Sequence, residues 1–138
     1  ITQKMKNIRS VIERAKDGSY SIYMDIDVKD LSYFITGTGE TLEKAKEDFI
    51  SGYEEMKAYY AEKGKPFEEV NFDFKIDVVS FLSYYATVFT LSGLSKITGI
   101  AKGQLSHYVT GQNKPNAKNE EKILNGLRTF GRDIAQLG

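Results

Sequence analysis

The side chains most suited to chemistry in this sequence lie within residues 90–115. They are ammonium, amide, imidazole and hydroxyl groups, which form hydrogen bonds with base edges and with phosphate oxygens. Their spacing fits two short helices joined by a turn, a unit that can hold such groups on one exposed surface. The candidate DNA-binding residues are Thr90, Lys102, Gly103, Gln104, Ser106, His107, Asn113 and Lys114.

The second of these helices would present its first residues to the major groove, together with the residue one turn further along. With Ala101 as the N-cap, those residues include Lys102, Gln104 and His107, and Ser106 lies beside them. Lysine can donate to guanine O6 and N7, and glutamine can form two hydrogen bonds with adenine. His107 could contact a base or a phosphate. The pattern therefore favours a helix that reads DNA sequence.

The remaining candidates suit positioning more than base reading. Gly103 would let the backbone approach closely, although glycine lowers helix propensity. Asn113 and Lys114 follow the second helix, and Thr90 caps the first, so these three suit phosphate contacts that set the register. In the plainer alternative all of them are ordinary surface residues, and a lone histidine beside a tyrosine is partly buried.

Carboxylates suggest a second chemistry. Asp25 and Asp27 share one face of an expected strand over residues 20–27, and Asp30 follows it. Paired carboxylates can hold Mg²⁺ for phosphodiester hydrolysis. Such a site needs three or four carboxylates from separate elements. The helix expected over residues 41–63 carries its carboxylates mostly on its polar face, away from the sheet. One histidine and no cysteine disfavour a His-based metal site, a Ser-His-Asp triad and thiolate chemistry. We expect no catalytic residue, metal ion or cofactor, and no enzyme.

Charge is unevenly distributed along the chain. Residues 1–77 hold twelve Lys/Arg and sixteen Asp/Glu, which gives −4, and residues 78–138 hold seven and three, which gives +4. No carboxylate occurs within residues 78–119, where Lys96, Lys102, Lys114 and Lys118 lie. Because a carboxylate opposes the approach of phosphate, this window favours a nucleic-acid-binding surface. The alternative is that carboxylates are absent by chance from a segment rich in serine, threonine and apolar residues.

Composition bounds the class of protein. The 138 residues suffice for one ordinary domain or two small ones, and 41% hydrophobic with 28% charged residues is typical of a globular chain. No apolar run approaches the roughly 20 residues that span a bilayer, and no signal-peptide pattern opens the sequence. With no cysteine there is no disulfide framework. We expect a cytoplasmic protein with no membrane partner.

Residues 1–77 are expected to form a small α+β domain. Residues 1–7 are polar and should be frayed or paired only at the start of a strand. Alternation predicts a strand over 20–27, which should form a hairpin with residues 8–15 through an Asp-Gly turn at 16–19, and residues 33–37 are expected to form a third strand.

A helix and one further strand complete this domain. Thr41 is a good N-cap, Glu43 complements the helix dipole, and apolar residues at three- and four-residue steps predict a helix to about Lys63. The alternation over 70–78 then predicts a strand at a sheet edge or in a partner's sheet. The expected order is β-β-β-α-β.

Residues 78–138 are expected to form an all-α domain. An apolar helix should follow Asp77, and the helix-turn-helix comes next, with Gly99 in its turn and Gly111 as a left-handed C-terminal cap. From Asn119 a last helix carries an apolar stripe that is either the core of the domain or a dimer seam. The stripe consists of Ile123, Leu127, Phe130, Ile134 and Leu137.

Both halves of the chain resemble known families. Residues 94–115, LSKITGIAKGQLSHYVTGQNKP, resemble the helix-turn-helix of phage repressors and XRE-type regulators. The N-terminal half resembles the HicB antitoxin domain, a reduced RNase H-like fold. The matching segments there are Asp17-Gly18-Ser19-Tyr20 and Gly39-Glu40-Thr41-Leu42-Glu43-Lys44-Ala45. Together the two cover nearly the whole chain in the order that this family uses.

The resemblance implies an antitoxin of a type II toxin–antitoxin system. Its N-terminal domain, residues 1–77, would mask a small HicA-like RNase toxin, and its helix-turn-helix domain, residues 78–138, would bind double-stranded operator DNA and repress the shared operon. Two-fold operators imply a dimer or tetramer, formed through the 70–78 strand or the last helix. The alternative is a stand-alone transcriptional regulator whose N-terminal domain binds a ligand or only oligomerises.

Overall fold

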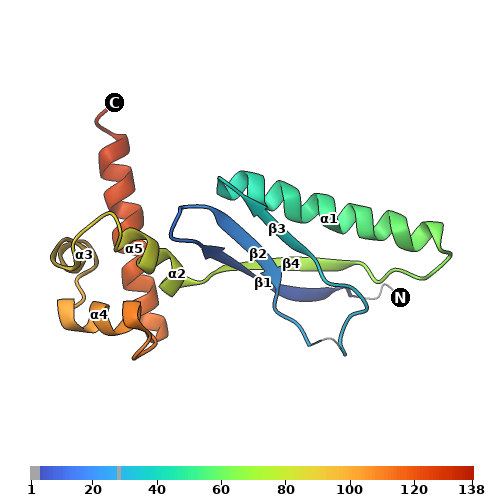
Figure 1. Ribbon diagram of the computed structural model, residues 1–138, viewed down its shortest axis with the longest axis horizontal. Coiled ribbons are helices and arrows are strands. Elements are labelled where there is room, and N and C mark those ends of the chain that lie inside the picture. The colour runs from blue at the N-terminus through green and yellow to red at the C-terminus, as the bar shows by residue number, and fades with distance from the viewer. Residues whose placement is uncertain (1–3, 28) are drawn as a thin grey trace. The chain divides into compact units, whose positions relative to one another are not determined.

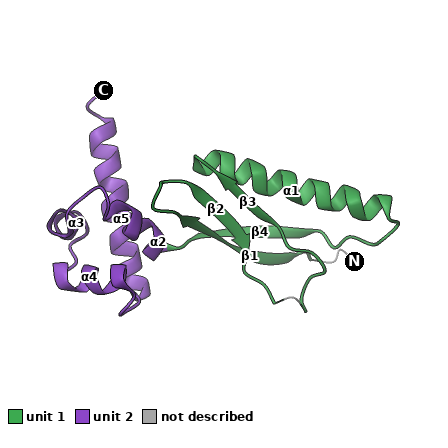
Figure 2. Ribbon diagram, in the orientation of Figure 1, with its two compact units in different colours: residues 1–77 green, residues 78–138 purple. Residues whose placement is uncertain are grey.

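The chain has an α+β fold that divides into two compact units, Ile1–Asp77 and Val78–Gly138 (Figures 1 and 2). The computed structural model describes residues 4–27 and 29–138. A mixed four-stranded sheet with one long helix makes up the first unit, and four helices make up the second. The expected α+β class is therefore confirmed.

The first unit is built on a sheet of strand order β3-β2-β1-β4. Antiparallel pairing joins β1 to β2 and β2 to β3, whereas β4 runs parallel to β1 at the edge of the sheet. The helix α1 covers one face of this sheet (Figure 1). The strands are β1 (Lys6–Arg14), β2 (Tyr20–Met24), β3 (Thr36–Gly39) and β4 (Val70–Ile76), and α1 spans Leu42–Glu62.

The predicted hairpin between the first two strands is confirmed. The turn closes through a hydrogen bond from the Gly18 amide to the Ala15 carbonyl, and Gly18 has a φ of 91°. Ser19 donates to the Asp17 carboxylate through its hydroxyl at 2.7 Å and its amide at 2.9 Å. These bonds lower the pKa of Asp17 below its ordinary value. Of the polar segment 1–7, residues 1–3 lie outside the described residues, and β1 begins at Lys6.

Helix α1 begins and packs as expected. The Thr41 side chain caps it by accepting from the Lys44 amide at 3.1 Å. Its inner face buries Phe49 and Tyr53 against Phe72 of β4, with ring centroids 4.8 and 5.0 Å away. These aromatic side chains thus form part of the core between the helix and the sheet, together with buried aliphatic residues such as Ile12 and Ile22.

The second and third strands have bounds that differ from expectation. The third strand was expected over 33–37, but β3 begins at Thr36, because Tyr33 is held in an aromatic cluster where its ring stacks on Phe67 at 4.6 Å. The second strand ends at Met24, so Asp25 and Asp27 do not lie on a strand face.

The strand β4 is also shorter than predicted, since it ends at Ile76 rather than at 78. Its place at the edge of the sheet agrees with expectation.

Strand β3 and helix α1 approach so closely that no side chain fits between them. A Cβ atom on Gly37 would lie 2.5 Å from the Phe49 amide nitrogen, and one on Gly39 would lie 2.5 Å from that of Ala45. Glycine is therefore required at both positions for the helix to cover this edge of the sheet.

The second unit contains four helices around a small apolar core. They are α2 (Val78–Tyr85), α3 (Leu91–Thr98), α4 (Lys102–Thr110) and α5 (Ala117–Ala135). Leu82, Leu94, Leu105 and Ile123 are fully buried, one from each helix. The last helix begins at Ala117 rather than at 119, because the Asn116 side chain caps it by accepting from the Asn119 amide at 2.8 Å.

Within residues 4–27 and 29–138, no helix has the length and apolar character needed to cross a bilayer.

Candidate nucleic-acid interface

Helices α3 and α4 are joined by a three-residue connection that turns the chain sharply. Gly99 ends α3 with a φ of 75°, a left-handed conformation that favours glycine. Ile100 then buries its side chain, and Ala101 precedes the first turn of α4. Gly111 ends α4 in the same left-handed conformation, with a φ of 81°. The expected left-handed cap and the glycine in the turn are both confirmed.

Two hydroxyl groups fix this connection. The Ser95 hydroxyl donates to the Ile100 carbonyl at 2.6 Å, and the Thr98 hydroxyl donates to the Leu94 carbonyl at 2.8 Å while accepting from the Ile100 amide at 3.2 Å. Ser95 and Thr98 therefore both hold the turn in place, a role that the sequence interpretation did not assign to either residue. The signal was available, since serine and threonine at a helix end commonly bond nearby backbone groups.

Helix α4 presents its first turn to solvent. Lys102, Gly103 and Gln104 are exposed, and Leu105 and Tyr108 bury the opposite face. Ala101 gives the helix no side-chain cap, so its first amides and the positive end of the helix dipole face outward. An anion such as a DNA phosphate would be favoured there.

The second turn of α4 continues the same surface. Ser106 is half-buried and His107 is exposed, so the histidine is not the partly buried residue of the plainer interpretation. Asn113 is also exposed, and its Nδ2 atom lies 3.4 Å from Nδ1 of His107. The structure thus brings together Lys102, Gly103, Gln104, Ser106, His107 and Asn113 on one helix and the loop that follows it.

The two remaining candidates lie on other elements. Thr90 is the N-cap of α3, where its hydroxyl oxygen accepts from the Gly93 amide at 3.0 Å. Because the oxygen is the acceptor in that bond, the hydroxyl hydrogen can still donate to a phosphate. Lys114 is exposed in the loop between α4 and α5. Both side chains are accessible.

Helix α5 packs against both α3 and α4. A Cβ atom on Gly126 would lie 2.6 Å from the Ile97 carbonyl oxygen, which shows that α5 and α3 are in backbone contact. The Asn119 side chain donates to the Tyr108 hydroxyl at 2.8 Å and so links α5 to α4. Neither Gly126 nor Asn119 was recognised from the sequence, since both roles depend on which helices are neighbours.

The carboxylates considered for a metal site, Asp25, Asp27 and Asp30, line one shallow hollow, but in the described part of the chain they are not placed to hold a metal ion together. Asp25 lies 3.3 Å from Arg9 in an exposed ion pair, and Asp27 accepts a hydrogen bond from the Lys29 amide at 3.1 Å. On α1, Asp48 accepts from the Thr38 amide at 2.9 Å. Among the described residues, no group of three or more His, Cys, Asp or Glu side chains is placed to hold a metal ion.

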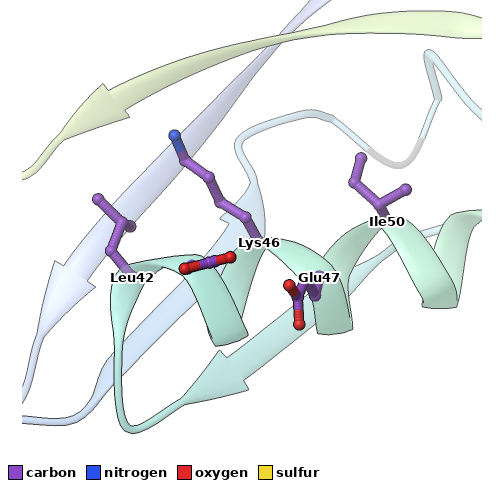
Figure 3. A pocket seen from close by; sticks show the side chains of 5 residues that line it. Leu42, Lys46, Glu47 and Ile50 are labelled. Atoms are coloured by element: carbon purple, nitrogen blue, oxygen red, sulfur yellow. The ribbon is translucent and has the colours of Figure 1, made fainter.

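A shallow hollow along α1 is lined by Leu42, Glu43, Lys46, Glu47 and Ile50 (Figure 3). Its aliphatic and charged side chains supply neither a nucleophile nor a general base held by a partner. It therefore gives no support to a catalytic reaction at this position.

A comparison of the chain with protein families, with curated proteins and with solved structures finds no match in any of the three.

Proposed function

We propose that this chain is a helix-turn-helix DNA-binding regulator of the HicB antitoxin type, which represses its own operon. The observation that carries the proposal is the exposed first turn of α4, with Lys102 and Gln104, inside a 42-residue window that contains no carboxylate. A recognition helix needs an accessible N-terminal turn and a surface free of negative charge. The α3–α4 pair provides both.

The residues of the interface divide in this proposal into those that read bases and those that contact phosphates. Lys102, Gln104 and His107 read base edges in the major groove, and Ser106 lies beside them. Gly103 leaves space for the DNA, since nothing lies within 4 Å of where its Cβ atom would be.

Phosphate contacts complete the interface. Thr90, Asn113 and Lys114 bind phosphates on either side of the helix and set its register in the groove. The Asn113 side chain also steadies His107 through their 3.4 Å contact.

The test is DNA binding by the double variant Lys102→Ala, Gln104→Ala. The probe is a duplex selected from a random pool by the wild-type protein, measured by gel shift beside a scrambled duplex. The variant should lose specific binding and keep the wild-type circular dichroism spectrum, because both side chains are exposed. A variant that binds the selected duplex as tightly as wild type would contradict the assignment.

The matched control is Lys16→Ala, Gln136→Ala, which removes the same two residue types at exposed positions outside the α3–α4 pair. This control should bind the selected duplex with wild-type affinity. Equal losses in both double variants would show only a nonspecific effect of charge.

The toxin-masking role is proposed for the first unit. The two segments that resemble the HicB domain lie where the backbone conformation is tightly constrained. One forms the β1–β2 turn, and the other forms the β3–α1 junction, at which Gly39 is required. The unit is also acidic, with twelve basic and sixteen acidic residues, which suits a basic RNA-binding partner. Pull-down from the native host tests this role. Recovery of a small basic RNase supports the antitoxin, and recovery of DNA alone supports the stand-alone regulator.

A further inference from the structure

Strand β4 presents an open sheet edge that contrasts with the opposite one. The sheet order is β3-β2-β1-β4, and no other strand in the described part of the chain pairs with the outer side of β4. The other edge, β3, is four residues long, and its Thr38 amide is occupied by Asp48 at 2.9 Å. Because β4 has seven residues and an apolar face, it is the edge suited to pairing with another strand.

The hydrogen bonds of β4 show which backbone groups face outward. The Asp77 amide donates to the Ile12 carbonyl of β1 at 2.8 Å, and amide directions alternate along a strand. The N–H and C=O groups of Phe72, Phe74 and Ile76 therefore point away from β1. In agreement, the Val70 amide donates to the Tyr53 hydroxyl at 3.2 Å instead of to β1. The free outward groups are thus centred on Phe74.

We infer that the partner of this edge is β4 of a second copy of the chain, paired antiparallel about a two-fold axis at Phe74. In this register Phe74 faces Phe74 of the second copy, and Phe72 faces Ile76. The outward N–H and C=O groups of these residues then form the hydrogen-bonded pairs of an antiparallel ladder. The two four-stranded sheets become one continuous sheet.

Charge favours this register over the two adjacent ones. Asp73 and Lys75 lie on the sheet face opposite α1, with exposed side-chain fractions of 56% and 52%, and their charged atoms are 3.7 Å apart. In the Phe74-centred pairing, Asp73 of each copy faces Lys75 of the other in the non-hydrogen-bonded positions, where side chains come closest. Two-fold axes at Asp73 or at Lys75 would instead place like charges opposite one another.

The apolar face of β4 also gains from the pairing. Phe72 and Phe74 are only half-buried in the single chain, where Phe49 packs against both rings. Lys46 extends from α1 toward this strand, with Nζ 5.2 Å from the centroid of the Phe74 ring (Figure 3). Pairing brings Phe74 beside its counterpart and so removes exposed ring surface from water.

This pairing does not depend on the proposed DNA binding. If both hold, one assembly carries two copies of α4, as a two-fold operator requires.

The experiment is sedimentation velocity of the full chain over a range of concentrations at low salt. Asp73→Lys sets two lysines opposite each other at every facing pair, and Lys75→Asp sets two aspartates opposite each other. Each variant should therefore self-associate at least about tenfold more weakly than wild type. An equimolar mixture of the two variants should recover wild-type association. One chain then carries lysine at both positions and the other carries aspartate at both, so every facing pair between unlike chains joins opposite charges.

The double variant Asp73→Lys, Lys75→Asp is the test of charge complementarity within one chain. It exchanges the two charges but keeps an opposite charge at every facing pair, so it should associate like wild type. A double variant as weak as the single variants would show that pairing of these charges does not set the register.

Lys16→Asp is the control for charge reversal at an exposed position away from β4, and it should associate like wild type. Ile134→Glu tests the other apolar surface, the end of α5, where Ile134 is 52% exposed. Association that is lost in Ile134→Glu but unchanged in Asp73→Lys would overturn the inference. So would a monomeric wild-type chain at every concentration, or a mixture of the two charge variants that fails to associate.

Crosslinking tests the register directly. The chain has no cysteine, and facing non-hydrogen-bonded residues have Cα atoms about 4.5 Å apart, within the range of a disulfide. A mixture of Asp73→Cys and Lys75→Cys chains should therefore oxidise to a covalent dimer much faster than either variant alone. Equal rates in the mixture and in the separate variants would contradict the Phe74-centred register.

Discussion

Gly126 on α5 lies directly against the backbone of Ile97 on α3, so that a Cβ atom at position 126 would be 2.6 Å from the Ile97 carbonyl oxygen. This contact fixes the distance between the last helix and the first helix of the α3–α4 pair. The DNA-binding surface proposed for α4 therefore depends on a residue that carries no side chain and lies on a different helix.

Gly126→Ala should destabilise the second unit. The added methyl group meets backbone atoms that cannot turn aside, and overpacking of this kind costs about 1–3 kcal/mol. Urea unfolding followed by circular dichroism measures the loss, and hydrogen exchange should place it in α3 and α5. Gly131→Ala on the same helix is the control, since nothing lies within 4 Å of its Cβ position and alanine should be neutral or stabilising there. Equal effects of the two substitutions would contradict the backbone contact.

Gly103→Ala should separate stability from DNA binding. The Cβ position at Gly103 is open and lies within α4, so alanine should raise the free energy of unfolding by about 0.5–1 kcal/mol through helix propensity. The same methyl group would occupy space proposed for the DNA backbone or a base edge. The variant should melt at a higher temperature and bind the selected duplex more weakly. Unchanged affinity would remove Gly103 from the interface.

Substitutions at Thr90 should separate its role as the N-cap of α3 from its proposed contact with a phosphate. Thr90→Ala removes the oxygen that accepts from Gly93 and should cost about 1 kcal/mol of stability. Thr90→Asp keeps a capping oxygen but places a negative charge beside the phosphates, so stability should be retained while DNA affinity falls. Thr90→Ser should retain both. Thermal melts and gel shifts measure the two effects, and wild-type affinity in Thr90→Asp would argue against a phosphate at this position.

Tyr33 should make the first unit sensitive to alkaline pH. Its hydroxyl donates to the Glu68 carbonyl at 2.6 Å, and burial, followed by the neighbouring Tyr53, raises the pKa of Tyr33 above its ordinary value. The unfolded chain releases this proton near pH 10, whereas the folded chain retains it. The unfolded state then binds fewer protons, so this contribution to stability is complete below about pH 10 and is lost as the pH rises further.

The measurement is urea unfolding at several pH values between about 8 and 11, compared with Tyr33→Phe. Wild type should lose up to about 1.4 kcal/mol per pH unit above pH 10 from this residue, and the variant should lose less. Tyr59→Phe, at a half-exposed ring that leaves Tyr33 in place, is the control and should keep the wild-type slope. Identical slopes in Tyr33→Phe and wild type would contradict the role of Tyr33.

Local patterns in the sequence were sufficient for most elements of the fold. The Asp17–Ser19 turn, the Thr41 cap and the left-handed Gly111 each depend on bonds within a few residues, so their positions could be predicted from residue type and spacing. Alternation likewise predicted β2 and β4, because a half-buried strand repeats every two residues, and the Asp-Gly turn placed β1 as the hairpin partner of β2. The exposed first turn of α4 followed from the same local reasoning.

Tertiary neighbours decided the rest. Strand β3 begins at Thr36 because Tyr33 is drawn into a cluster with Phe67, more than 30 residues away in the sequence. Gly37 and Gly126 are required by helices that pass over them, and the sequence does not show which helix passes where.

The open edge of β4 likewise depends on the parallel pairing of β4 with β1, a contact between residues more than 60 positions apart. Residue type and spacing by themselves determined local turns, caps and amphipathic faces. Only the tertiary structure decided which of these faces are covered and which remain free, because burial depends on contacts between distant segments.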